Sequence, residues 1–185
     1  MEFDKVVDKR KSVRKFKSKK PDWRDILKAV DSSLNIPLAG NIPCIKYILV
    51  DEVDKIKKIK DSCQQDFVGK AQYLIVVCSD NTDVERSYDK KGRDYVKQEV
   101  GASIHNFLLK LTDLGLAGCW VGFFIESQIK RTLNIPEDII VEAVIPIGYS
   151  DDKTGMKRKP NLDRSLYFNE YKQSFLKKRD EIEGR

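Results

Sequence analysis

The chain has 185 residues, of which 41% are hydrophobic and 35% are charged, and its formal net charge at pH 7 is +6. This length and composition predict a single domain over residues 1–185 with a core that needs no disulfides. They exclude a membrane-spanning helix, because no run approaches ~20 apolar residues. The charge alone does not indicate nucleic-acid binding, since the lysines are spread along the chain.

The cysteines are widely spaced and form no C-x-x-C pair. With His105 as the single histidine, the sequence predicts no metal site, and reduced thiols in a cytoplasmic protein are the simplest interpretation. Residues 1–20 are charged throughout and contain no apolar signal segment, which favours the same location. Residues 182–185 resemble a protease-recognition sequence and are left out of the fold prediction.

Helical spacing of apolar residues predicts a short helix over 3–10 and a longer one over 22–34. Residues 35–43 hold two prolines, a glycine and two asparagines, and therefore predict a loop. A strand over 46–50 follows, and then a helix over 53–59 whose lysine-rich side is expected to face solvent.

The apolar run over 73–78 predicts a strand that is covered on both faces. Residues 81–97 are polar and indicate either a mobile flap or a surface helix. The strongest helical stripe runs from Val100 to Leu111, with Gly115 as its capping residue. The remaining predicted elements are a strand over 118–124, a helix over 126–133, a strand over 139–147, and a terminal helix or arm over 166–178.

Helices and strands are interspersed without strict βαβ alternation, so the chain is predicted to be an α+β or mixed α/β layer protein. Neither a G-x-x-x-x-G-K-[ST] motif nor a G-x-G-x-x-G motif after a strand occurs in the sequence.

Two guanidiniums and a hydroxyl alternate at Arg10, Ser12 and Arg14. In an extended chain these side chains lie on one side, because neighbouring residues alternate between faces. Arginine forks match phosphate oxygens, so this row suits a bound oxyanion. A second basic cluster, Lys-Arg-Lys-Pro at 157–160, lies near the other end of the chain. If the fold brings both together, they would form one phosphate pocket.

Several stretches follow one another along nearly the whole chain: 10–16, 39–41, 98–104, 114–122, 145–149 and 158–160. In this order they resemble the nitroreductase family of flavoproteins. The resemblance implies a three-layer α/β/α fold of the α+β class, with a central mixed, mostly antiparallel sheet flanked by helices. It also implies a homodimer with FMN at the subunit interface. Such proteins pass electrons from NAD(P)H through FMN to nitroaromatic, quinone or similar acceptors by a ping-pong mechanism.

The resemblance also implies roles for individual residues. Arg10 and Ser12 would hold the FMN phosphate and ribityl chain together with Arg158, and Lys11 would lie beside them. Arg14 would lie near the N1–C2=O edge of the flavin ring, where a fixed cation favours the reduced state.

The other implied contacts lie on the two faces of the ring. The partner subunit would cover one face with Pro37, Leu38, Ala39 and Asn41. Cys119, Val121 and Gly122 would pass along the other face, with the Val121 backbone N–H pointing at N5. Residues 101–103, which are small, would pack at the dimer interface. No catalytic side chain and no metal are expected, because the hydride chemistry takes place at FMN N5.

Two departures from the family pattern affect the acceptor pocket. Residues 43–45 are Pro-Cys-Ile, where many relatives carry Gln-Pro-Trp. Residues 79–97, where larger relatives build a substrate cover, are a modest polar stretch, and we expect the pocket above the flavin to be comparatively open.

Two alternatives remain open. The same scaffold in relatives supports dehalogenation, flavin fragmentation and azoline oxidation. The sequence pI near 9.0 also allows a non-catalytic basic binding module, although the sequence shows no interleaved exposed aromatics or recognition motif for nucleic acid.

Overall fold

The structure is a computed structural model that describes residues 1–155 and 162–175. The chain divides into two compact units, Met1–Lys153 and Thr154–Arg185, and each is described by itself. The prediction of a single domain over residues 1–185 stays a prediction.

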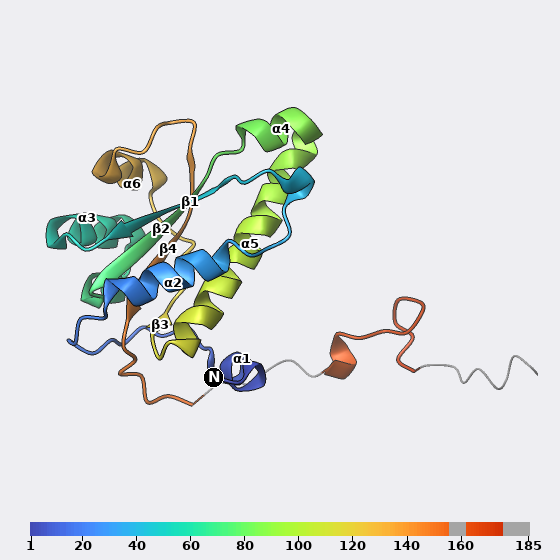
Figure 1. The fold of residues 1–185 in the computed structure, drawn as a ribbon, viewed down its shortest axis with the longest axis horizontal. Helices are drawn as coiled ribbons and strands as arrows, with labels where there is room; N and C mark the ends of the chain where they lie inside the picture. Colours follow the sequence, from blue (N-terminus) through green and yellow to red (C-terminus); the bar gives the residue numbers. More distant parts are fainter. Residues whose placement is uncertain (156–161, 176–185) are drawn as a thin grey trace, which may run out of the picture. The chain divides into compact units, whose positions relative to one another are not determined.

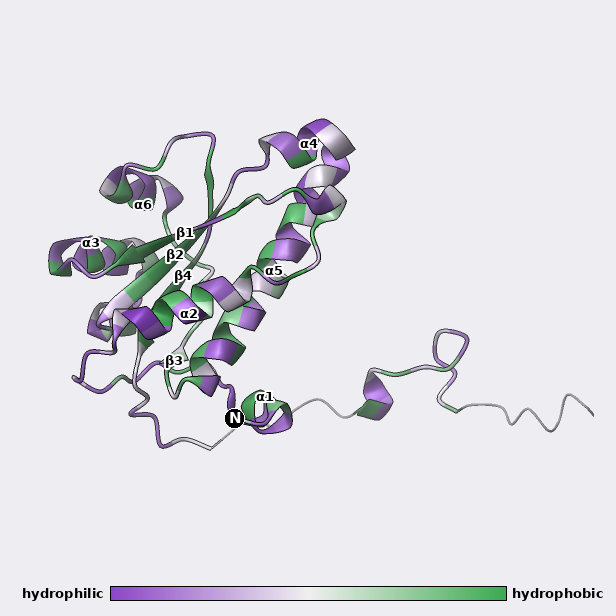
Figure 2. Ribbon diagram, in the orientation of Figure 1, coloured by the Kyte–Doolittle hydropathy of each residue, from purple (hydrophilic) through white to green (hydrophobic). Residues whose placement is uncertain are grey.

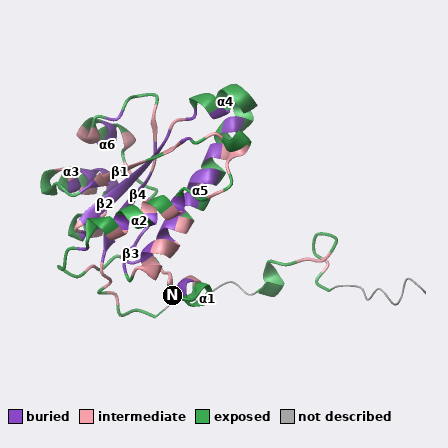
Figure 3. Ribbon diagram, in the orientation of Figure 1, coloured by how far each residue is buried: buried purple, intermediate pink, exposed green. Residues whose placement is uncertain are grey.

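The first unit is built on a four-stranded sheet (Figure 1). Its strands are β1 (Ile45–Val50), β2 (Tyr73–Ser79), β3 (Ala117–Gly118) and β4 (Ile140–Gly148), in the order β1-β2-β4-β3. All three pairings between these strands are antiparallel. β2 is buried along its whole length, as Figure 3 shows, which confirms the prediction of a strand covered on both faces.

Helices cover both faces of the sheet, and the residues of β2 alternate between the two cores. Tyr73, Ile75 and Val77 pack with α2 (Trp23–Ser33) and α5 (Lys90–Asp113). The intervening strand residues, Leu74, Val76 and Cys78, pack with α3 (Val53–Cys63) and α6 (Glu126–Leu133). The apolar strands between the helices stand out in Figure 2. The predicted three-layer α+β fold is therefore confirmed.

Smaller elements complete the described residues. They are the helices α1 (Phe3–Lys9) and α4 (Thr82–Tyr88) and the 3-10 turns η1 (Ala39–Asn41), η2 (Asp66–Lys70) and η3 (Leu162–Arg164).

The polar stretch over 81–97 is helical, and α5 begins ten residues before the predicted stripe. Val96 is fully buried one turn before Val100 and extends the apolar stripe backwards. Gly92 lies against the backbone of Val84, where a Cβ atom would come within 2.7 Å of the Val84 carbonyl oxygen. The second of the two predictions for this stretch, a helix, is therefore correct, and α4 packs closely on α5 here.

Two predicted elements are shorter than expected. The strand over 118–124 reduces to β3 and one bridge between Val121 and Val144, because the chain leaves the sheet edge with Phe123 exposed. Residues 166–175 hold turns and bends in place of the helix that was one of the two predictions for this segment.

Candidate functional site

The segment over residues 10–16 is extended, as predicted, and lies along the sheet at β3 and after β4. The backbone N–H of Val13 donates to the Gly118 carbonyl at 3.1 Å, and Phe16 forms a bridge with Ser150. Val13 is buried, whereas Ser12 and Arg14 on either side of it are exposed. The buried valine therefore fixes which side chains of this segment face outward.

Ser12 and Arg14 both influence the thiol of Cys119, which is only 2% exposed. Burial raises the pKa of this thiol, while the positive charge of Arg14 and a side-chain hydrogen bond with Ser12 lower it by less. The Arg14 guanidinium also lies over the ring of Phe67, with 5.7 Å between Cζ and the ring centroid. The structure thus brings Ser12 and Arg14 close to Cys119, a third predicted site residue that lies more than 100 positions further along the sequence.

The cationic side chains of residues 10, 11 and 14 differ in whether they form ion pairs. Lys11 donates to the Asp152 carbonyl at 3.2 Å and lies 3.8 Å from its carboxylate. Within the described part of the chain, neither Arg10 nor Arg14 forms an ion pair with a carboxylate. Their guanidinium charges are therefore available to an anion. Arg158 lies outside the described residues.

The second predicted group, Pro37, Leu38, Ala39 and Asn41, lies elsewhere on the molecule. Gly40 and Asn41 adopt left-handed φ angles of 59° and 57°. The backbone N–H of Ala39 donates to a Glu99 carboxylate oxygen at 2.6 Å, so the loop is anchored to α5.

A depression of about 350 Å³ lies beside this loop. Three of the predicted residues line it together with the first half of α5. Its lining residues are Pro37, Leu38, Ala39, Tyr95, Gln98, Glu99 and Ala102.

The loop of residues 37–41 and the segment around Gly118 contact α5 at different positions along the helix axis. Ala39 is bonded to Glu99, whereas Gly118 lies against Leu108, where a Cβ atom would come within 3.3 Å of the leucine side chain. Nine residues separate these positions on the helix, which corresponds to about 14 Å along its axis. In one chain the structure therefore does not bring the loop together with Arg14 and Cys119.

One expected contact is wrong in this structure. The Val121 backbone N–H was expected to point at the flavin N5, but it donates to the Val144 carbonyl at 2.9 Å. The Val144 N–H returns a bond of 3.0 Å to Val121, so the sheet uses both polar groups of this residue. Gly122 follows it on the exposed side, where a Cβ atom would meet only Trp120, at 4.0 Å.

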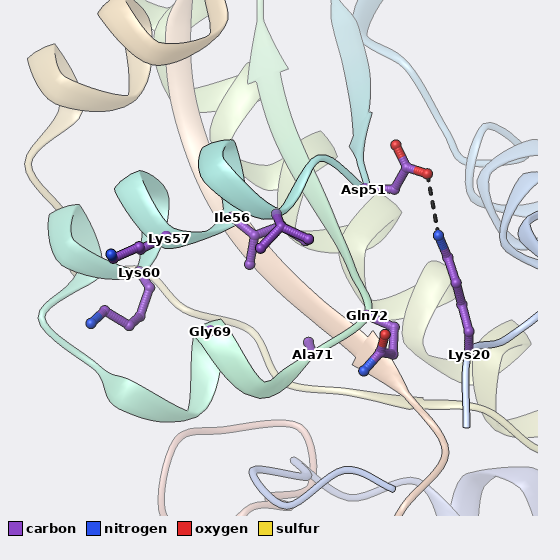
Figure 4. A pocket seen from close by; sticks show the side chains of 9 residues that line it. Lys20, Asp51, Ile56, Lys57, Lys60, Gly69, Ala71 and Gln72 are labelled. Carbon is purple, nitrogen blue, oxygen red and sulfur yellow. Dashed lines mark hydrogen bonds and ion pairs between the residues drawn. The ribbon is translucent and has the colours of Figure 1, made fainter. Parts of the chain in front are cut away.

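A depression of about 400 Å³ between α3 and the start of β2 contains none of the predicted residues (Figure 4). Lys20 on its rim pairs with Asp51 at 3.3 Å. Lys57 and Lys60 extend from α3 away from Lys20, so the ammonium groups do not converge on one point. This geometry assigns no ligand to the depression.

Two residues that contact predicted site residues were not predicted from the sequence. Phe67 lies on η2, which was not predicted, and its contact with Arg14 depends on the tertiary fold. Glu99 could have been noticed in the sequence, because it is an acidic residue next to Val100 in the apolar stripe of the helix. The sequence analysis assigned no role to it.

No group of three or more potential metal ligands occurs in the part of the chain that the structure describes. None of its helices combines the length and the apolar character required to cross a bilayer.

A model of the nitroreductase family matches residues 60–149. Among solved structures, a nitroreductase family protein from Clostridium novyi NT is 28% identical, with 95% of this chain and 97% of that chain covered and a TM-score of 0.75. An NADPH:FMN oxidoreductase from Vibrio harveyi, complexed with NAD+, shares the fold at a TM-score of 0.82 and 17% identity, over 92% of this chain and 78% of that chain. The iodotyrosine deiodinase of Thermotoga neapolitana is 23% identical over 80% of this chain and 88% of its own length.

Proposed function

The chain belongs to the nitroreductase family of oxidoreductases, and we propose that it binds FMN and uses NAD(P)H to reduce nitroaromatic, quinone or similar acceptors. The similar fold of an NADPH:FMN oxidoreductase supports both the cofactor and the electron donor. FMN, when bound, supplies the redox chemistry by accepting electrons from NAD(P)H and passing them to the acceptor.

The observation that carries this proposal is that Ser12 and Arg14, which are exposed, both influence the Cys119 thiol next to the end of β3. Arg10 and Arg14 have no carboxylate partner among the described residues, so they can neutralise an anion without losing an ion pair. The FMN phosphate carries nearly two negative charges and fits arginine forks and hydroxyl donors. These residues therefore fit the cofactor.

We assign the following roles within this proposal. Arg10 and Ser12 hold the phosphate and ribityl chain together with Arg158, and Lys11 lies beside them. Arg14 stabilises negative charge at the N1 edge of the ring. Cys119 and Gly122 lie along one ring face, while Val121 anchors that segment to the sheet through Val144. No side-chain acid or base is required for the electron transfer.

The proposal includes a homodimer in which Pro37, Leu38, Ala39 and Asn41 cover the flavin held by the other subunit. The axial separation of about 14 Å along α5 supports this arrangement, because one chain cannot readily apply both groups to the same ring. Gly101 on α5 adds support, since no atom lies within 4 Å of a Cβ at this position, which leaves room for a second backbone.

Absorption spectroscopy of the purified protein tests the proposal. We expect flavin bands after addition of FMN, bleaching by NADH or NADPH, and recovery of the bands when a quinone or nitroaromatic acceptor is added. A protein that takes up no FMN would refute the proposal. Comparing NADH with NADPH in the same assay gives the preferred donor.

The similarity to an iodotyrosine deiodinase favours one second candidate function, reductive dehalogenation. Flavin bleaching by nicotinamide with release of halide from halogenated phenols, but without turnover of nitro or quinone acceptors, would favour this chemistry. Turnover of the nitro and quinone acceptors alone would dismiss it.

A further inference from the structure

The Glu99 carboxylate lies inside the protein, with a residue exposure of 5%, and joins two segments of the chain. One of its oxygens accepts the Ala39 N–H at 2.6 Å, and the other accepts the Cys44 thiol at 3.2 Å. Glu99 forms no ion pair among the described residues. A buried carboxylate is costly unless donors satisfy it, so these two donors hold both the charge and the chain segments in place.

The loop is also confined from its other side. The Tyr88 hydroxyl lies so close to Gly40 that a Cβ atom there would be 2.8 Å away, and Tyr88 packs edge-on against Tyr95 at 5.3 Å. Gly40 has a φ of 59°, a conformation that glycine adopts without strain. The turn is therefore fixed between α4 and the Glu99 carboxylate.

We propose that Glu99 is a positioning residue that presets the loop of residues 37–41 for flavin binding, and that the Cys44 thiol is the second donor that keeps its carboxylate in place. The part that concerns FMN rests on the proposed function. A preset loop loses less conformational entropy when it closes over a ligand, which raises affinity without a direct contact from Glu99.

Cys44 is suited to this role because it remains a donor over the physiological pH range. Burial, followed by the hydrogen bond with Glu99 and its negative charge, raises the pKa of the Cys44 thiol to about 12. The S–H group is therefore retained at neutral pH. Serine at this position would also offer a donor, whereas alanine would leave one carboxylate oxygen without a partner.

Two measurements on the full chain test the proposal. Hydrogen exchange, followed without FMN, should show amide exchange at Ala39 accelerated about ten-fold or more in Glu99→Gln, which keeps the size of the side chain but provides only one acceptor oxygen. Fluorescence titration with FMN should show a dissociation constant raised by a similar factor. Cys44→Ala should reproduce both effects, and Cys44→Ser should largely restore wild-type behaviour.

Cys63→Ala is the matched control, because Cys63 is also a fully buried thiol but lies in the core on the opposite face of the sheet. It should lower the unfolding temperature as Cys44→Ala does, without changing exchange at Ala39 or FMN affinity. Unchanged exchange at Ala39 in Glu99→Gln would overturn the positioning role. Faster exchange with unchanged FMN affinity would overturn its link to flavin binding. Failure of the wild-type protein to bind FMN would refute the proposed function, and exchange at Ala39 would still decide the positioning role.

Discussion

The guanidinium of Arg14 lies 5.7 Å from the centre of the Phe67 ring, and its charge also acts on the Cys119 thiol. The aromatic ring restricts the long arginine side chain at the place where the proposed flavin edge lies. A cation that is already ordered before the ligand arrives loses less entropy on binding. This contact makes Arg14 the sharpest single test of the proposed site.

Arg14→Gln should raise the FMN dissociation constant about ten-fold or more, since an interaction with a charged group is typically worth ~1.5–3 kcal/mol. It should also make the reduction potential of the bound flavin more negative, because less positive charge remains to stabilise the reduced state. Flavin fluorescence and redox titration measure the two effects. Arg24→Gln is the control, because Arg24 also lies over an aromatic ring, that of Trp23, but on α2. Equal losses in both variants would argue against the site.

The elements that the sequence predicted best are those with a single dominant pattern. The continuous apolar run of β2 and the helical stripe of α2 each determine a local structure, so both were confirmed. The prediction that side chains alternate between two faces over residues 10–16 was also correct. Val13 is buried on one face, so Ser12 and Arg14 point to the other.

The missed features depend on contacts between distant segments. Neither the start of α5 at Lys90 nor the hydrogen bond from Ala39 to Glu99 follows from local spacing, since α4 and the loop supply the partners. The Val121 N–H was assigned by resemblance to a flavin contact, and only the register with Val144 shows that the sheet uses it. The predicted convergence of Arg10 with Arg158 stays a prediction, because Arg158 lies outside the described residues.

Two glycines of α5 should respond to alanine in opposite ways. Gly92→Ala would place a Cβ 2.7 Å from the Val84 carbonyl oxygen, so the free energy of unfolding should fall by ~1–3 kcal/mol. Gly101→Ala meets no atom within 4 Å and should stabilise the isolated chain by ~0.5–1 kcal/mol through helix propensity. Denaturant unfolding measures both values.

Gly101→Ala also tests the proposed dimer. If a second backbone packs against this position, the added methyl group should weaken self-association although it stabilises the single chain. Sedimentation over a range of protein concentrations gives the dissociation constant. An unchanged constant would place the dimer contact elsewhere on the molecule.

Asp22 provides a direct test of helix capping at the start of α2. Its carboxylate accepts the Arg24 backbone N–H at 2.9 Å, so Asp22→Ala should lower the free energy of unfolding by ~1 kcal/mol. Glu52 occupies the corresponding position before α3 but makes no side-chain capping bond. Glu52→Ala is therefore the control and should have a smaller effect. Equal effects would contradict the capping role.

Acid unfolding should depend on Asp113. Hydrogen bonds from Lys110, at 2.8 Å, and from the Met1 ammonium, at 2.6 Å, lower the pKa of this carboxyl from 3.8 to about 2. Because the folded pKa is depressed, the stabilisation is present above pH 3.8 and is lost as the pH falls towards about 2. Asp113→Asn should thus be less stable than wild type at neutral pH, and the two unfolding curves should converge near pH 2. Asp54→Asn replaces an exposed carboxyl in the first turn of α3 and is the control, which should leave the pH dependence of stability unchanged. A difference in stability between wild type and Asp113→Asn that stays constant down to pH 2 would contradict the role of Asp113.

The four thiols should be unreactive in the folded protein. All are buried and free, and burial raises the pKa of Cys63 and of Cys78 to about 11 and contributes most to the raised values of Cys44 and Cys119. Since the thiolate is the reactive form, a thiol of pKa about 11 is ionised to roughly one part in a thousand at pH 8.

A coloured disulfide reagent should therefore react slowly with native protein and promptly with all four cysteines after denaturation. Rapid native reaction confined to Cys119, and blocked by FMN, would contradict an inert thiol there. It would show instead that the charge of Arg14 and the Ser12 hydrogen bond outweigh burial, and that a reactive sulfur faces the bound cofactor.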